Sequence, residues 1–164
     1  MPKAVCFPHA DDQFETPFEL MEWLDCDLRN LHGGYYRYRE ARGLGRLEPG
    51  SLVFFYKNKL IVGSAVVEKA SRPLEDSEIQ RCAEIYREEN CAGMKNIVKF
   101  FTNSIWVWDE HDLVNESEFK EITGKNLDYY ASVNPDEVMK LYGLVAKKRE
   151  EMEKRALGTH NDLS

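Results

Sequence analysis

The feature that most constrains the fold is a pair of β-forming segments in the middle of the chain, joined by a very short connection. Residues 51–56 (SLVFFY) and 60–69 (LIVGSAVVEK) are rich in β-branched and aromatic residues, which favour strands. Residues 57–59 leave room only for a tight turn, so the two strands are predicted to form an antiparallel hairpin. Gly63 lies inside the second strand, where the missing side chain lets a backbone or a ligand approach closely or lets the sheet bend.

The elements predicted around this hairpin indicate the fold class. Their order is β-α-β-β-β-α-β-β-α, and several strands follow one another directly. Consecutive strands disfavour an alternating doubly wound fold and favour a mixed or antiparallel, partly closed sheet with helices at its flanks. We therefore predict an α+β protein. The further strands are expected at residues 3–7, 35–38 and 96–108, the last bent or broken near Thr102, and the helices at 16–31, 77–90, 116–122 and from Asn134 onward.

The first of these helices has its own start and stop signals. Thr16 is expected to cap it, with a proline at the first helical position. Its apolar stripe is expected at Phe18, Met21, Leu24, Leu28 and Leu31. Gly33-Gly34 is expected to end it, because glycine accepts the left-handed conformation found at helix ends.

The last predicted helix suggests where the domain ends. Val138, Leu141, Tyr142 and Val145 form an apolar stripe, which fades after Ala146 into the charged run KKREEMEKRA. A chain of 164 residues fits one domain. We predict a domain over residues 1–146 and a charged helical extension, tail or linker over residues 147–164.

Composition limits where in the cell the protein is expected and which ligands it is expected to hold. No run approaches the ~18 apolar residues that a membrane span needs, and the N-terminus lacks a signal-peptide pattern. The four cysteines are not spaced as metal ligands, so we expect reduced, mostly packed thiols, no metal and no cofactor. These features predict a cytoplasmic protein with no membrane contact.

Charge is distributed unevenly along the chain. Residues 33–72 hold eight Lys/Arg and three Glu, a net charge of +5. The other residues together carry a net charge of −12, which gives −7 for the whole chain. A basic stretch on an acidic body favours an anionic partner bound in one orientation, although an ordinary solvated surface would also give this pattern. The predicted phosphate-binding residues are Arg37, Arg39, Arg42, Arg46, Lys57 and Lys59.

Aromatic residues alternate with these cations. Tyr35, Tyr36 and Tyr38 interleave with arginines, and aromatic faces stack on unpaired or extruded nucleic-acid bases. Each tyrosine taken singly is equally compatible with a core position. A second aromatic pair, Trp106 and Trp108, shares one face of a predicted strand. That face is either the wall of a pocket or the core, and the alternation allows both.

Catalytic signals are weak. His9 lies near Asp11, and His111 lies between Glu110 and Asp112, but neither has a nucleophile at a recognisable spacing. Histidines flanked by acids on turns are usually solvated. The sequence therefore favours a binding role over catalysis, while a Lys/Glu/Thr amidohydrolase arrangement scattered through the chain stays open.

The run from Gly33 to Pro73 resembles an EVE-type domain of the PUA-like superfamily, which also includes the YTH and ASCH domains. The resemblance rests on a Gly-aromatic-basic stretch ending in Ala41-Arg42, a Pro49-Gly50 turn into an apolar strand ending at Phe55-Tyr56, and the pattern I-V-G-x-A-x-V at 61–67. The late run FFTNSIWVWDE is similar to a closing strand of related proteins. Ser51 replaces the usual acid after the turn glycine, and the hairpin is shorter than in many EVE domains.

This resemblance implies a small mixed β-barrel flanked by helices that binds nucleic acid, DNA or RNA. It implies recognition of a modified base turned out of its strand, as in the target-reading modules of modification-dependent restriction systems. The alternatives are an ASCH-like hydrolase of a modified nucleoside and a protein-interaction domain that docks through the helix from Pro135. The predicted base pocket consists of Tyr35, Tyr36, Tyr38, Phe55, Ser64, Trp106 and Trp108.

Overall fold

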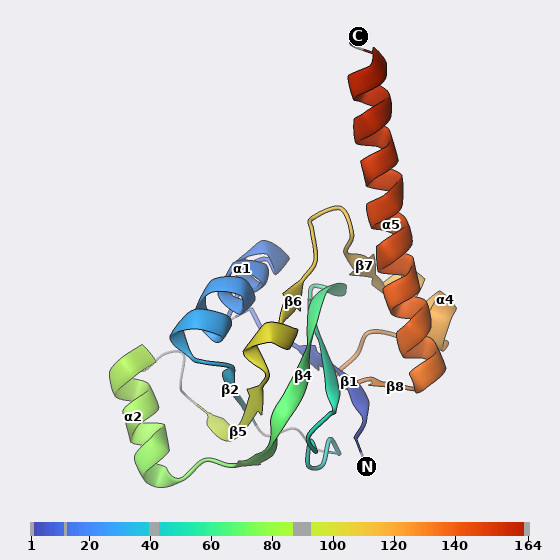
Figure 1. The fold of residues 1–164 in the computed structure, drawn as a ribbon. Coiled ribbons are helices and arrows are strands. Elements are labelled where there is room, and N and C mark those ends of the chain that lie inside the picture. The colour runs from blue at the N-terminus through green and yellow to red at the C-terminus, as the bar shows by residue number, and fades with distance from the viewer. Residues whose placement is uncertain (1, 12, 40–42, 87–92, 163–164) are drawn as a thin grey trace.

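The predicted hairpin forms the two central strands of one strongly curved sheet (Figure 1). In the computed structural model, which describes residues 2–11, 13–39, 43–86 and 93–162, β3 (Leu52–Lys57) pairs antiparallel with β4 (Leu60–Pro73). Asn58 and Lys59 have φ of 52° and 61°, as a two-residue type I′ turn requires. The predicted hairpin is confirmed, and β4 runs four residues beyond the expected end at Lys69.

The other strands extend this hairpin on both sides. The hydrogen-bonded order is β2-β5-β4-β3-β1-β8, and β6 and β7 also pair with β4. The β1–β3 pair is parallel and the remaining pairs are antiparallel, so the sheet is mixed. The added strands are β1 (Ala4–Pro8), β2 (Tyr35–Arg39), β5 (Met94–Phe100), β6 (Trp106–Val107), β7 (Val114–Asn115) and β8 (Ser132–Val133).

The sheet curls around its own interior. Three strands separate β1 from β2 in the hydrogen-bonded order, yet the ring of Phe7 on β1 lies 5.3 Å from the ring of Tyr38 on β2. Curvature alone brings these side chains together across the interior. The predicted α+β fold with a small, mixed and barrel-like sheet is confirmed, with β2 and β8 at the two ends of the strand order.

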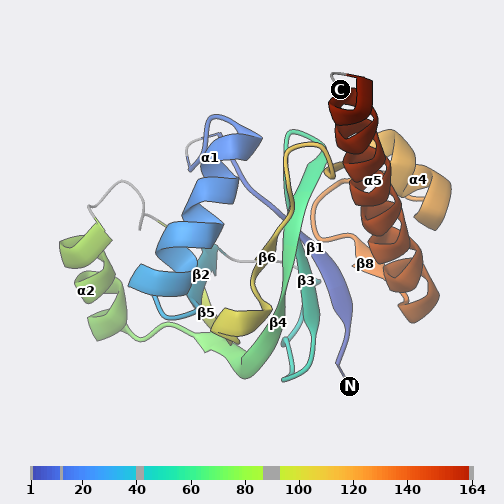
Figure 2. The same ribbon diagram turned by 45° about the horizontal axis from the view of Figure 1, so that its top comes forward.

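Helices flank both sides of this sheet (Figures 1 and 2). The first begins as α1 (Pro17–Glu22) and continues into the π-helical segment η1 (Trp23–Leu31). Thr16 caps it as predicted, with its hydroxyl accepting a hydrogen bond from the Glu19 N–H at 3.2 Å. The apolar stripe differs at its ends, where Phe18 and Leu31 are exposed, because the wider π-helical turn aligns Leu20, Leu24 and Leu28 instead.

A glycine ends this helix against β5. Gly34 has a φ of +86°, and a Cβ built on it would lie 2.2 Å from the carbonyl oxygen of Phe100. The backbone N–H of Phe100 donates to the Gly34 carbonyl at 2.8 Å. Only glycine permits this contact, so the predicted stop at Gly33-Gly34 also fixes where the helix meets the sheet.

The described residues also form α2 (Asp76–Tyr86), the short 3-10 helix η2 (Thr102–Ser104), α4 (Glu116–Thr123) and α5 (Pro135–Asp162). Leu141 and Val145 of α5 are buried as predicted. Lys148 still contacts the domain, donating to the Leu113 carbonyl at 2.7 Å, and beyond it α5 projects away from the sheet (Figure 1). No helix among the described residues is long and apolar enough to cross a membrane.

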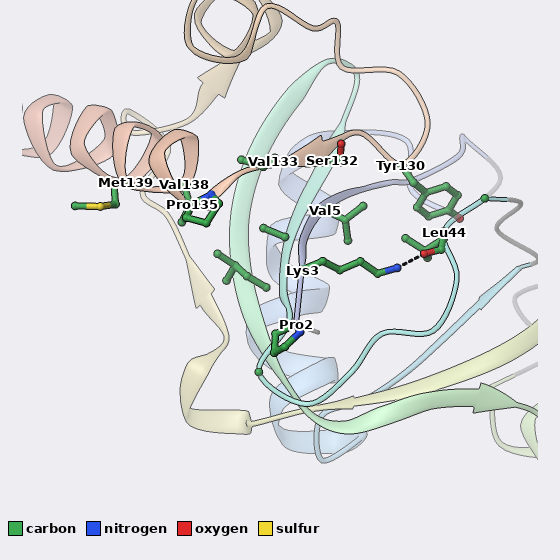
Figure 3. Close-up of a pocket in the computed structure, with 14 residues that line it drawn as sticks. Pro2, Lys3, Val5, Leu44, Tyr130, Ser132, Val133, Pro135, Val138 and Met139 are labelled. Carbon is green, nitrogen blue, oxygen red and sulfur yellow. Dashed lines mark hydrogen bonds between the residues drawn. The ribbon is translucent and has the colours of Figure 1, made fainter.

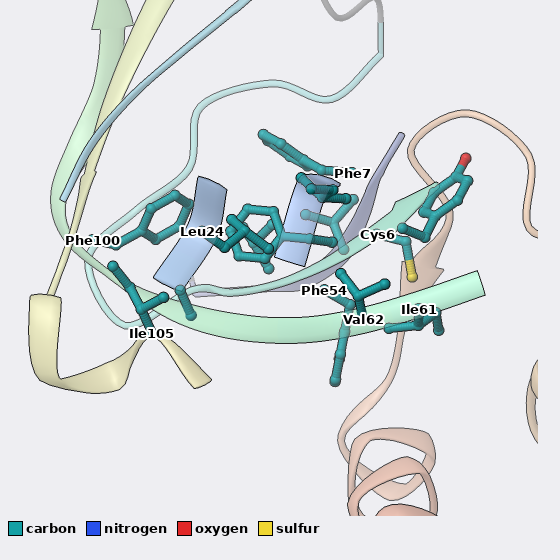
Figure 4. Packing of buried hydrophobic residues seen from close by; sticks show 14 of the residues in the cluster. Cys6, Phe7, Leu24, Phe54, Ile61, Val62, Phe100 and Ile105 are labelled. Atoms are coloured by element: carbon teal, nitrogen blue, oxygen red, sulfur yellow. The ribbon is translucent and has the colours of Figure 1, made fainter. Parts of the chain in front are cut away.

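The sheet has a buried layer on each face (Figure 4). Phe54 and Phe55 are neighbours on β3 and point in opposite directions. Phe55 packs inside the curl against Phe100 at a ring distance of 5.5 Å, whereas Phe54 packs toward α5 against Tyr142 at 5.5 Å. Of the cysteines, Cys6 is buried, which raises its thiol pKa to about 12, and Cys26 is exposed. The side chains of Cys82 and Cys91 lie outside the described part of the chain.

Candidate functional site

Four aromatic rings form a closed circuit at one end of the curled sheet, which we name the aromatic cage. Neighbouring ring centroids are 5.7–6.0 Å apart, and neighbouring rings are inclined by 63–82°. Edge-on arrangements of this kind are favourable for aromatic pairs and keep the rings from collapsing into a stack. In the order of their contacts, the rings belong to His9, Phe14, Trp23 and Tyr36.

The cage surrounds a cavity of about 170 Å³. Its walls come from separate parts of the fold: the segment after β1, the junction of α1 and η1, β2 and the start of β5. Gln13, Arg37 and Met94 complete the lining, so the cavity combines aromatic rings with polar and aliphatic residues. This arrangement suits a planar, partly polar ligand.

Hydrogen bonds hold two of the rings in place. His9 Nδ1 lies 3.0 Å from the carbonyl oxygen of Tyr56, and His9 Nε2 lies 2.7 Å from the hydroxyl of Tyr36. Burial, and to a lesser extent the nearby Lys57 cation, lowers the pKa of His9 to about 4, so the ring is neutral at pH 7. The expectation of a solvated His9 is wrong, because the chain after β1 turns inward under the first helix.

Cations lie close to this end of the sheet. Arg37 lines the cavity itself. On the outward side of β2, the Lys69 and Lys99 ammonium groups lie 5.9 Å and 5.8 Å from the ring centre of Tyr35. The basic character predicted for this segment is therefore partly concentrated beside the cage.

The predicted tyrosines take three different positions. Tyr36 is part of the cage, Tyr38 points into the interior beside Phe7, and Tyr35 lies on the outward side. Phe55 supports the cage from behind, at a ring distance of 5.7 Å from Tyr36. Strand alternation in the sequence already indicated that Tyr35 faces the opposite side of β2 from Tyr36 and Tyr38. The sequence did not indicate that Tyr38 is buried in the interior of the sheet.

The predicted tryptophans do not join this cavity. Trp106 and Trp108 lie on the opposite face of the sheet, beneath α5, where the Trp106 ring stacks on Tyr142 at 5.7 Å and 17°. Trp108 is 2% exposed, and the hydroxyls of Ser64 and Tyr142 are 2.8 Å apart. We name Phe54, Trp106, Trp108 and Tyr142 the helix-covered cluster. The expectation that one pocket unites the tyrosines with Trp106, Trp108 and Ser64 is corrected, because β3 and β4 separate the two groups.

Several of the predicted phosphate-binding residues already have carboxylate partners. Lys57 is 2% exposed and pairs with Asp11, because the end of β3 is covered on both faces. Lys59 pairs with Asp128, and Arg46 lies 3.8 Å from Glu48. The structure thus places Lys57 away from solvent, unlike the prediction. Arg42 lies outside the described residues, and Arg39 is half-buried on the outward side of β2.

A larger cavity of about 610 Å³ lies between β1 and the start of α5 (Figure 3). Its walls are mostly aliphatic, from residues such as Val5, Val133 and Val138, and Lys3 reaches the Leu44 carbonyl within it. It contains one aromatic ring, Tyr130, and no facing partner for it in the lining. The larger cavity therefore lacks the stacking geometry of the cage.

Two cage residues were not among the sequence candidates. Phe14 and Trp23 lie outside the basic segment that drew attention, and Trp23 sits where α1 becomes η1. Trp23 is half-buried and lies off the apolar stripe of its helix. A tryptophan outside that stripe was the one sequence signal that could have identified it. Within the described ranges, no three His, Cys, Asp or Glu side chains lie together as metal ligands would.

Two solved structures share this fold. A point mutant of ZmASCH from Zymomonas mobilis is similar with a TM-score of 0.57 over 87% of this chain and 98% of that one, at 11% sequence identity. The N-terminal domain of Thermococcus gammatolerans McrB bound to m5C DNA is similar with a TM-score of 0.51 over 88% and 98%, at 12% identity.

These neighbours confirm the fold that the predicted resemblance to EVE-type, PUA-like domains implies. Neither the protein-family models nor the curated proteins compared with the sequence give a match.

Proposed function

We propose that this chain is a nucleic-acid-binding module that reads a modified base inserted into the aromatic cage. The observation that carries the proposal is the closed circuit of four rings around a cavity of about 170 Å³. Turning a base out of its strand costs a few kcal/mol, and stacking returns roughly 1–3 kcal/mol per base. A preformed cage with adjacent cations offsets the cost of extrusion.

Size and fold both support a single base as the ligand. The cavity is smaller than the ~300 Å³ at which drug-sized pockets begin, so it suits one planar base and excludes a whole nucleotide. The McrB domain of the same fold is described as bound to m5C DNA. By analogy, a role as the target-recognition part of a modification-dependent restriction system is part of this proposal.

Contacts to phosphate would position the strand over the cage. Arg37 is the cation closest to the bound base, since it lines the cavity. Arg39 and Lys69 lie on the adjacent outward side of the sheet. Lys99, Arg46 and Lys59 offer further contacts once their carboxylate partners are displaced. Binding through such contacts weakens steeply as salt is added.

The test measures how two tryptophan variants bind a panel of modified and unmodified oligonucleotides at low salt. Trp23→Ala removes a cage wall, and we expect it to weaken binding of the preferred oligonucleotide roughly 5- to 100-fold. Trp106→Ala is the matched control, because Trp106 is 41% exposed on the other face of the sheet. Absence of binding by the unaltered protein, or equal losses in both variants, would contradict the proposal.

An ASCH-like hydrolase acting on a modified nucleoside is the second candidate, and the similarity to ZmASCH favours it. The cage is poorly suited to proton transfer at neutral pH, because burial lowers the pKa of His9 to about 4 and raises that of Tyr36 well above its usual value. Mass detection of nucleoside turnover distinguishes the two candidates. Turnover that Trp23→Ala abolishes would replace the binding proposal with the enzymatic one.

A further inference from the structure

The hydrogen bonds of His9 determine which protons the cage wall carries. A backbone carbonyl can only accept, so at 3.0 Å the Tyr56 oxygen requires the proton of the ring on His9 Nδ1. The ring is neutral at pH 7, since its pKa is lowered mainly by burial, and Nε2 is therefore the unprotonated nitrogen.

The polarity of Tyr36 follows from this tautomer. An unprotonated Nε2 can only accept, so the Tyr36 hydroxyl donates its single proton to His9 across 2.7 Å. The hydroxyl oxygen of Tyr36 keeps lone pairs and has no proton left to offer. Both residues line the cavity, so this part of the wall accepts hydrogen bonds and cannot donate them.

We propose that the His9–Tyr36 pair makes the cage selective for a base whose inserted edge carries an amino group, as in cytosine or adenine, over a base with an oxo group there. This inference rests on the proposed function and names its substrate class. The exocyclic group projects furthest from the ring and meets the wall first. An amino N–H donates to Tyr36, whereas an oxo group would place two acceptors face to face.

The experiment uses single-stranded oligonucleotides that differ at one base. One pair holds 5-methylcytosine or thymine, which share the methyl group and differ in the amino or oxo group, and a second pair holds adenine or hypoxanthine. We expect the amino member of at least one pair to bind roughly ten- to hundredfold more tightly. In Tyr36→Phe, which keeps the ring, this ratio should fall to about one because the acceptor is gone.

His9→Leu provides an independent readout. It frees the Tyr36 hydroxyl to donate as well as accept, so the oxo member should gain affinity while the amino member changes little. Thermal melting confirms that each variant is folded. Equal binding of both members by the unaltered protein, or a ratio that Tyr36→Phe leaves unchanged, overturns this inference alone. If none of the four oligonucleotides binds, the proposed function fails with it.

Discussion

The aromatic cage and the helix-covered cluster are built from similar residues on opposite faces of one sheet. The cage lines a cavity, whereas rings in the helix-covered cluster stack on one another. Both contain tryptophan and tyrosine rings about 6 Å apart. In the helix-covered cluster, Tyr142 of α5 stacks directly on Trp106 and fills the space that a ligand would need. In the cage, neighbouring rings meet edge to face and do not stack. Aromatic content alone therefore does not indicate a site, because what covers the rings decides their role.

The largest expected effect is a loss of stability, without a loss of binding, on substitution of Trp108. Trp108→Ala removes a fully covered ring from the helix-covered cluster and should lower the free energy of unfolding by about 3–5 kcal/mol. Chemical denaturation measures this loss. The folded fraction should keep its affinity for the preferred oligonucleotide, and a loss of affinity at equal folded concentration would show that the two clusters act together.

Acid should unfold the protein partly through the cage. The pKa of His9 falls from 6.5 to about 4 in the fold, mainly through burial, with Tyr36 and the Lys57 cation as its charged or titratable neighbours. The stabilisation from neutral His9 is fully present above pH 6.5 and is lost as the pH falls toward 4, by about 3 kcal/mol in total.

Denaturation curves at several pH values measure this dependence. His9→Gln should flatten it over that interval, whereas His111→Gln, at an exposed position, should not. An unchanged pH profile in His9→Gln would mean that other groups cause the acid loss.

A cation at the cage should matter more for binding than one on the projecting helix. Arg37→Gln is expected to weaken oligonucleotide binding and to reduce the slope of log affinity against log salt by about 1. Arg149→Gln is the control, since Arg149 lies on α5 near Glu153. Equal slopes for the two variants would remove Arg37 from the phosphate contacts.

The smallest expected effect lies in the helix-covered cluster. Tyr142→Phe keeps the ring stacked on Trp106 but loses the hydrogen bond with Ser64, which should cost about 1 kcal/mol of stability. Binding should be unchanged. A change in base preference would assign this face a role that its geometry does not suggest.

Local signals in the sequence predicted most of the elements. The hairpin at residues 57–60, the cap at Thr16 and the stop at Gly34 each depend on neighbours in the chain, and each is present in the structure. Gly63 was expected to allow a close approach, and a Cβ there would lie 2.4 Å from the carbonyl oxygen of Trp106. Such features are predictable because each depends on the type of one residue or on a few neighbouring residues in the chain.

The candidate site was predicted only in part. Tyr36, Phe55 and Arg37 were identified through the basic aromatic segment, and all three contact or line the cage. Phe14 and Trp23 were missed, because nothing in the segments around them shows that β2 curls back to meet them. Ser64 and the two later tryptophans were grouped with the tyrosines because strand alternation cannot tell which face a helix will cover.

By itself, the sequence determined most of the secondary structure, a mixed or antiparallel sheet, the PUA-like resemblance and the positive charge of residues 33–72. These depend on local conformational preference and composition. Only the tertiary structure decided which aromatic rings surround a cavity and which are packed. It also decided that His9 is buried and neutral, and that Lys57 is covered. Those outcomes depend on the curvature of the sheet and the position of α5, which bring together residues far apart in the chain.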